Sequence, residues 1–132
     1  MSEERTEYGE RMKSKAGLGR IWRAFGYSRE GLWAAAKHEH AFRQELFLVG
    51  PLGVLAVVLP VGWVETALLI ASLLGVLIVE LLNSAMEACV DYISQERHPL
   101  AKRAKDMGSA AVFLAMTAAA LVWGAVLGAH WL

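Results

Sequence analysis

The amino-acid sequence predicts an all-α integral membrane protein, with three membrane-spanning helices preceded by an amphipathic helix at the membrane surface. The composition and the distribution of charge lead to this fold class. Hydrophobic residues make up 56% of the 132 residues, and the mean hydropathy of +0.39 is high for a water-soluble protein of this length. The basic residues avoid three long apolar stretches and gather beside them. A soluble bundle of buried helices is the alternative, but apolar runs of this length are typical of membrane spans.

The first 45 residues are predicted to lie at the membrane surface. Residues 1–19 form a charged extension without the apolar core of a cleavable signal peptide, and residues 20–45 form the surface helix. Two apolar groups flank a Gly-Tyr-Ser triplet: Ile21, Trp22 and Phe25 before it, and Leu32, Trp33 and Ala36 after it. Basic residues and tryptophans on opposite faces are typical of a helix lying in the interface. We expect the triplet to break the helix, with Ser28 as a new N-cap.

Three stretches are long and apolar enough to cross a bilayer, which takes about 20 residues of helix. Residues 46–63 contain no charge. Residues 66–93 carry their first charge at Glu80, and residues 107–132 contain no Asp, Glu, Lys or Arg. The single cysteine, Cys89, excludes a disulfide within the chain. The sequence therefore predicts three spanning helices over these ranges.

The basic residues predict the orientation of the chain in the membrane. Of the 13 Lys and Arg, nine lie before residue 46 and the other four lie between the second and third spans. None lies in the link at 64–65 or after residue 106. Because short loops rich in Lys and Arg stay in the cytoplasm, the N-terminus and the 94–106 loop are expected to be cytoplasmic, with the C-terminus on the other side.

The second span carries polar residues that a structural membrane helix would avoid. Relative to Glu80, a helix places Asn83 at about −60°, Glu87 at about −20° and Asp91 at about +20°, so the four side chains form one narrow stripe. A charge at the bilayer centre costs at least ~2.5–3.5 kcal/mol, and ionisable residues there are functional candidates by default. A lone protomer would expose this stripe to lipid, which predicts burial against neighbouring subunits.

The chemistry of the stripe leaves two function classes open. Carboxylates on successive turns can hold Mg²⁺ together with substrate phosphates, and a carboxylate further along could accept the proton of a lipid hydroxyl. The basic loop, with Lys102, Arg103 and Lys105, could meet the phosphates. Phosphoryl transfer to a lipid is the first reading. A small proton or cation pathway is the second, because such pathways also use membrane carboxylates.

Three motifs resemble one known family. They are "AFRQE" at 41–45, "E-x-x-N-S-A-x-E-x-x-V-D" at 80–91 and "AKDMGSAAV" at 104–112. Over about residues 20–132 the chain resembles the prokaryotic integral-membrane diacylglycerol kinases, a family that also includes undecaprenol kinases. The resemblance implies a homotrimer in the bacterial cytoplasmic (inner) membrane. It also implies transfer of the γ-phosphate of MgATP to the hydroxyl of 1,2-diacylglycerol, which gives phosphatidic acid in phospholipid metabolism.

The resemblance also implies roles for individual residues. Glu80 corresponds to the catalytic base, and Glu39 and Glu87 correspond to ligands of Mg²⁺ and ATP that are expected to converge. The other ATP-binding positions are Arg20, Tyr27, Glu96, His98, Lys105 and Asp106. The lipid-binding positions are Arg20, Ala41, Phe42, Arg43, Gln44, Glu45, Glu80 and Ser109. Asn83 and Asp91 are expected to support this site.

Several of these roles have plainer alternatives. His98 could be a solvated loop residue, Ser109 could let helices approach closely, and Lys102 and Arg103 could serve only to set topology. Pro51 and Pro60 depart from the family pattern and could kink the first span. The first and third motifs favour diacylglycerol over undecaprenol as the lipid substrate. No nucleic-acid partner is expected.

Overall fold

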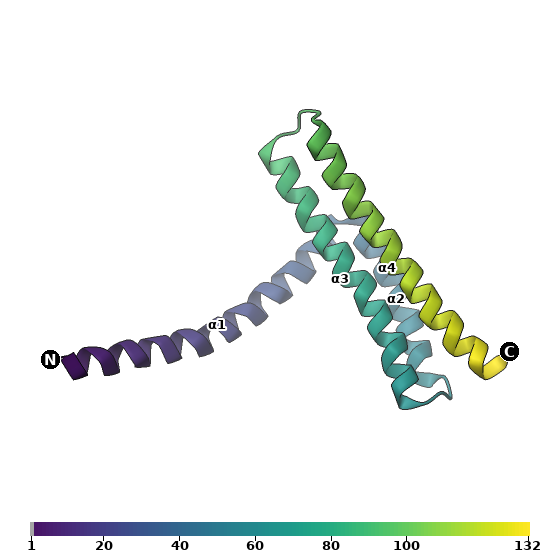
Figure 1. Cartoon of the computed structure of the whole chain (residues 1–132), viewed down its shortest axis with the longest axis horizontal. Coiled ribbons are helices and arrows are strands. Elements are labelled where there is room, and N and C mark those ends of the chain that lie inside the picture. The colour runs from purple at the N-terminus through teal and green to yellow at the C-terminus, as the bar shows by residue number, and fades with distance from the viewer. Residues whose placement is uncertain (1) are drawn as a thin grey trace. The chain divides into compact units, whose positions relative to one another are not determined.

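The protein consists of four helices joined by short links (Figure 1). The computed structural model describes the backbone of residues 2–132 and all side chains in that range except those of residues 2, 8 and 10–16. The helices are α1 (Ser2–His38), α2 (His40–Val58), α3 (Trp63–Ile93) and α4 (Pro99–Trp131). The chain divides into two compact units, residues 1–37 and residues 38–132. Three helices, α2, α3 and α4, are long and apolar enough to cross a membrane.

Helix α1 is continuous, so the expected break with an N-cap at Ser28 is wrong. A glycine inside a helix costs only about 1 kcal/mol and serine less, and no proline follows to enforce a stop. In one unbroken helix, Phe25 and Leu32 fall within about 40° of Ile21, and Trp22 and Trp33 fall within about 120°. The two apolar groups therefore form one exposed face rather than two separate ones.

The helix that is expected at the membrane surface, α1, ends at His38 and not at residue 45. Its described part also includes the charged extension before residue 20. Glu39 has an extended backbone (φ −104°, ψ 110°) and separates α1 from α2. The carbonyl oxygen of Glu39 accepts a hydrogen bond from the Arg43 amide at 3.2 Å, which starts α2. The segment 41–45 consequently lies in the first turns of α2, the first candidate span, and not on the surface helix.

The two prolines of the expected first span have different positions. Pro51 lies inside α2, whereas Pro60 lies beyond its end at Val58. Proline cannot donate a backbone hydrogen bond, and it disfavours helical backbone in the residue before it. Leu59, which precedes Pro60, has an extended backbone (φ −64°, ψ 134°) and caps the helix. Pro60 therefore contributes to the turn between α2 and α3, and only Pro51 remains as a possible cause of a kink.

The core of the second unit lies where α2, α3 and α4 meet. Its buried side chains are Ala56, Leu69, Leu73, Trp123 and Val126. Helix α3 packs mainly along α4 and less extensively along α2. Most of the remaining large apolar side chains on the three helices are exposed in the protomer. Such surfaces fit a lipid environment, in which apolar side chains need no protein cover.

Helices α3 and α4 form an antiparallel hairpin around the 94–98 link (Figure 1). Polar contacts join the pair at both ends. At the link end, Lys105 on α4 forms an ion pair with Asp91 on α3. At the opposite end, His130 Nε2 lies 2.5 Å from Glu65 Oε2. These contacts lie at the two ends of the hairpin, and between them α4 runs along the polar stripe of α3.

Candidate active site

The polar stripe runs along the half of α3 that is nearer the 94–98 link. Glu80 is buried, with 5% of its surface exposed, Asn83 and Glu87 are half-buried, and Asp91 is exposed. The stripe therefore passes from the interior of the helical unit to its surface within one continuous helix. The expectation that one protomer would leave the whole stripe exposed is wrong for Glu80.

Glu80 faces a second buried carboxyl group, that of Glu45 on α2. Glu45 is 8% exposed, and its carboxyl group lies within electrostatic range of Glu80. Its Oε2 atom is buried and has no hydrogen-bond partner among the described residues. The Ser84 hydroxyl lies 3.5 Å from Glu80 Oε1, one turn along α3. Glu80 thus has a polar neighbour on each of two helices.

Two further carboxylates act on Glu80 through space. Glu87 and Glu39 both lie within electrostatic range of it. Glu87 comes from the same stripe, and Glu39 precedes the first turn of α2. Negative charges gathered in this way repel one another, and a bound cation would relieve that repulsion.

The donor set fits a magnesium ion that shares its ligands with phosphates. Mg²⁺ prefers carboxylate oxygens and is usually bound by one or two of them, with water and substrate phosphates completing the shell. Glu39 and Glu87 offer this chemistry. In the described part of the chain, no three His, Cys, Asp or Glu side chains converge into a complete metal cage. The expected meeting of Glu39 and Glu87 around the ion stays a prediction.

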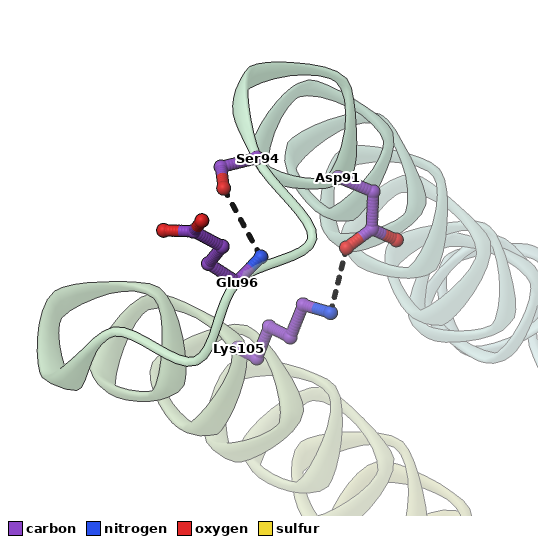
Figure 2. A network of polar contacts seen from close by, with 4 residues as sticks. All are labelled: Asp91, Ser94, Glu96 and Lys105. Atoms are coloured by element: carbon purple, nitrogen blue, oxygen red, sulfur yellow. Dashed lines mark hydrogen bonds and ion pairs between the residues drawn. The ribbon is translucent and has the colours of Figure 1, made fainter.

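The exposed end of the stripe is tied to α4 by a charge pair. Lys105 Nζ lies 2.8 Å from Asp91 Oδ1, and about half of each side chain is exposed (Figure 2). The negative charge of Glu87 also acts on Lys105. On the outer side of α4, Lys102 pairs with Asp106 one turn away at 2.6 Å. Two of the expected ATP-binding residues, Lys105 and Asp106, therefore each pair with an oppositely charged side chain.

The 94–98 link is ordered by its own side chains. The Ser94 hydroxyl accepts the Glu96 amide at 3.0 Å (Figure 2). His98 caps α4, because its Nδ1 accepts the Leu100 amide at 3.1 Å and Pro99 occupies the first turn. His98 is exposed, which fits the plain alternative of a solvated loop residue, and it also caps α4.

A hollow of about 520 Å³ lies between this link and the adjoining ends of α3 and α4. Glu96 and His98 line it, as expected of residues that share one binding site. Arg97 lines it as well. From the sequence, Arg97 counts only as one of the basic residues that set topology. Its position between Glu96 and His98, two candidate nucleotide contacts, could have indicated that it belongs to the same site.

The segment 41–45 splits into an inner and an outer face. Phe42 and Glu45 are buried, Arg43 is half-buried, and Ala41 and Gln44 are exposed. The Gln44 amide contacts the ring of His40 at 3.2 Å. Glu45, on the inner face, lies within electrostatic range of Glu80 and so connects this segment to the stripe.

Three expected site residues lie away from this cluster or outside its unit. Ser109 is exposed on α4, and no hydrogen bond or charge pair joins it to the stripe within the described residues. Arg20 and Tyr27 are exposed on α1, in the other compact unit. Their roles stay predictions.

An apolar cavity of about 250 Å³ adjoins Glu45 between α2, α3 and α4. Leu52, Val76 and Trp123 are among its walls, and Glu45 is the one acidic residue in the lining. Trp123 Nε1 is buried and has no hydrogen-bond partner in the described part of the chain. Trp123 could not be identified as a cavity residue from the sequence, because it is one of 5 tryptophans and nothing in its neighbourhood distinguishes it. The cavity offers an apolar space that ends at a carboxyl group.

A model of one protein family, described as prokaryotic diacylglycerol kinase, matches residues 26–127. The chain belongs to the prokaryotic diacylglycerol kinase family. All the proposed site residues except Arg20 lie within this match. The family relationship agrees with the resemblance carried by the three motifs.

Curated members of the family are similar over most of their length. A diacylglycerol kinase of Pseudomonas aeruginosa is 53% identical over 115 residues, which cover 87% of this chain and 94% of the relative. That of Escherichia coli (strain K12) is 50% identical over 114 residues, covering 86% and 93%. One from Helicobacter pylori is 42% identical over 116 residues, covering 88% and 91%. The chain is thus a close relative of diacylglycerol kinases along nearly its whole length.

Proposed function

We propose that this protein is an ATP-dependent diacylglycerol kinase that transfers the γ-phosphate of MgATP to the hydroxyl of 1,2-diacylglycerol, giving phosphatidic acid and ADP. Membership of the family and the relatives at 53% and 50% identity support the reaction. The observation that carries the mechanism is the position of Glu80. It is the buried end of a polar stripe, and its partner Glu45 borders an apolar cavity.

Glu80 acts as the general base. The oxygen of the lipid hydroxyl forms a bond to the γ-phosphorus, the bond from that phosphorus to the β–γ bridging oxygen breaks, and the hydroxyl proton passes to the Glu80 carboxylate. A positioned base contributes roughly 10²–10⁴-fold to such a step. The Ser84 hydroxyl lies 3.5 Å from Glu80 Oε1, and Glu45 lies within electrostatic range of Glu80, so both are placed to influence this carboxyl group.

Glu39 and Glu87 would hold the magnesium ion of MgATP, which would supply charge neutralisation at the phosphate oxygens. Glu87 lies two helical turns from Glu80 on the same stripe, at a rise of about 1.5 Å per residue. The chain therefore separates the residue that binds the metal from the residue that accepts the proton, while keeping both on one rigid helix.

The nucleotide binds at the link end of α3 and α4. Glu96, Arg97 and His98 line the hollow there. Lys105 on α4 lies beside the same end of the stripe, where it pairs with Asp91. A phosphate oxygen can replace Asp91 as the partner of Lys105, because both are anionic acceptors for an ammonium group. Asp106 contributes from the next position on α4, and Arg20 and Tyr27 contribute from α1.

The lipid approaches from the membrane side of the same carboxyl pair. The cavity bordered by Glu45 and Trp123 accepts an apolar portion of diacylglycerol, while the free hydroxyl reaches Glu80. Because the acyl chains enter from a lipid phase and not from water, the cavity favours them by close packing and not by the hydrophobic effect. Ala41, Phe42, Arg43, Gln44 and Ser109 complete the lipid site from the first turns of α2 and from α4.

The enzyme works as a homotrimer in the cytoplasmic (inner) membrane, with its N-terminus in the cytoplasm. The large apolar surfaces of α2, α3 and α4 leave room for neighbouring subunits as well as lipid. Each site is shared, so residues of one subunit complete the stripe of the next.

Lipid choice provides the test of this function. Purified protein in mixed micelles is supplied with MgATP and either diacylglycerol or undecaprenol at equal mole fraction, and the phosphorylated lipid is quantified. We expect phosphatidic acid to form at a much higher rate than undecaprenyl phosphate. The reverse order would assign the chain to the undecaprenol kinases of the same family. Ion flux through reconstituted vesicles without any lipid phosphorylation would support the pathway reading instead.

A further inference from the structure

Gly108 on α4 makes an unusually close approach to the stripe on α3. A β-carbon added at this position would collide with Asn83 Oδ1 and lie 3.0 Å from Asn83 Cγ. It would also lie 2.7 Å from the terminal methyl carbon of Met86. Real β-carbons essentially never come within 3.0 Å of such atoms. The bare α-carbon of Gly108 therefore occupies a space that no other residue type could share with Asn83 as it stands.

Other glycines of the spanning helices differ from Gly108. A β-carbon added at Gly75 or Gly128 would meet no heavy atom within 4 Å among the described residues. The close approach is thus a local feature of one point on the α3–α4 seam. It is not a general consequence of glycine in membrane helices.

The side chain seated on Gly108 is unusual in its own right. Asn83 Oδ1 is buried and has no hydrogen-bond partner within the described part of the chain. Leaving a buried acceptor without a partner costs about 1–3 kcal/mol. Buried polar groups without partners are rare, and each calls for a structural or functional reason. The carboxamide is held by packing against Gly108 and Met86 rather than by hydrogen bonds at its oxygen.

The position of Asn83 connects its close contact with Gly108 to the two proposed catalytic-site glutamates. Asn83 follows Glu80 by three residues and precedes Glu87 by four, so its carboxamide stands within one turn of each on the same face. Any rotation of the carboxamide changes the surroundings of both carboxylates. We propose that Gly108 is a positioning residue for phosphoryl transfer, because its missing side chain seats the Asn83 carboxamide between Glu80 and Glu87. This inference rests on the proposed roles of those two glutamates.

The collision at position 108 can be relieved without unfolding. The atoms in the way are the far ends of two flexible side chains, Asn83 and Met86, and not backbone. Alanine at position 108 would displace them by rotation about their side-chain bonds. The loss should therefore appear in turnover while the helices remain packed.

The first experiment compares Gly108→Ala with the matched variant Gly75→Ala, both purified in detergent. We expect Gly108→Ala to lower kcat by about 10- to 100-fold, since a misplacement of about 1 Å can cost that much. Its KM for MgATP and its melting temperature should stay close to those of Gly75→Ala, which should resemble wild type. Wild-type turnover in Gly108→Ala would overturn the proposal. So would failure of Gly108→Ala to fold, because the glycine would then serve packing alone.

A double-mutant cycle tests whether Gly108 acts through Asn83. In an Asn83→Ala background the colliding carboxamide is gone, so Gly108→Ala should lower kcat little further. Non-additivity of this kind is expected only for residues that act together. An equal fold-loss in both backgrounds would overturn the proposal. Glu80→Gln and Glu87→Gln measured alongside separate this result from the proposed function, which fails if those variants keep wild-type turnover whatever Gly108→Ala does.

Discussion

Lys105 Nζ lies 2.8 Å from Asp91 Oδ1, and this pair joins α4 to the exposed end of the polar stripe on α3 (Figure 2). Each partner comes from a different motif, and each was assigned to the site on different grounds. Their contact places the lysine of "AKDMGSAAV" beside the stripe carboxylates, so one short stretch of the hairpin holds both Lys105, proposed to bind phosphate, and Glu87, proposed to bind the metal.

We predict that Lys105→Met raises the KM for MgATP by about 10-fold or more, because a hydrogen bond between two charged groups is lost. Asp91→Asn should not raise this KM, since a phosphate oxygen is proposed to replace Asp91 as the partner of Lys105. Initial rates at varied MgATP give both values. Lys102→Met is the matched control, because within the described part of the chain Lys102 pairs with Asp106 on its own helix and not with the stripe. A Lys102→Met variant as impaired as Lys105→Met would mean that only the overall positive charge matters.

Replacing the base should separate chemistry from binding. Glu80→Gln keeps the size and polarity of the side chain but cannot take a proton, so kcat should fall by roughly 10²–10⁴-fold. MgATP binding, measured by calorimetry on the detergent-solubilised protein, should stay largely unchanged. Near-normal turnover in a folded Glu80→Gln variant would remove this residue from the role.

Replacing either proposed metal ligand should change the magnesium dependence of the rate. We predict that Glu87→Gln and Glu39→Gln raise the Mg²⁺ concentration needed for half-maximal rate and weaken nucleotide binding, because each removes a carboxylate ligand. A magnesium titration at fixed ATP measures the shift. Glu65→Gln on the same helix as Glu87 is the control, since Glu65 pairs with His130 at the far end of the hairpin. An unchanged titration for both variants would show that other residues bind the ion.

Shared sites predict recovery of activity in mixed trimers. Glu80→Gln and Glu39→Gln protomers, each inactive alone, are coexpressed with different affinity tags and purified through both. Some activity should return if the two residues of one site come from different subunits. No recovery in verified mixed trimers would mean that Glu39 and Glu80 act within one chain, and an active monodisperse monomer would contradict the trimer itself.

The stripe could be predicted from sequence because helical periodicity is a local property. Glu80, Asn83, Glu87 and Asp91 recur at intervals of three or four residues in a helix whose length the apolar run already implied. The break between α1 and α2 could not be predicted. No proline or glycine at or beside Glu39 indicates that a helix ends there. The Gly-Tyr-Ser triplet at 26–28 is typical of a helix end, but α1 continues through it at a small cost in free energy.

Contacts between helices were outside the reach of the sequence. Glu45 was assigned to the lipid site by its motif alone, and nothing along the chain indicated that its carboxyl group faces Glu80 across two helices. The seat of Asn83 on Gly108 likewise depends on the register of α3 against α4, which is set by side-chain packing. Periodicity places residues on faces, but only the packed hairpin shows which faces meet.

The most direct measurement follows the labelled γ-phosphate of MgATP in micelles that contain diacylglycerol, with wild type and Glu80→Gln compared at equal protein. The proposed mechanism predicts that wild type forms labelled phosphatidic acid and ADP in equal amounts, and that both fall together in Glu80→Gln. ADP and free phosphate formed by wild type without labelled lipid, or labelled phosphatidic acid formed equally well by Glu80→Gln, would contradict it.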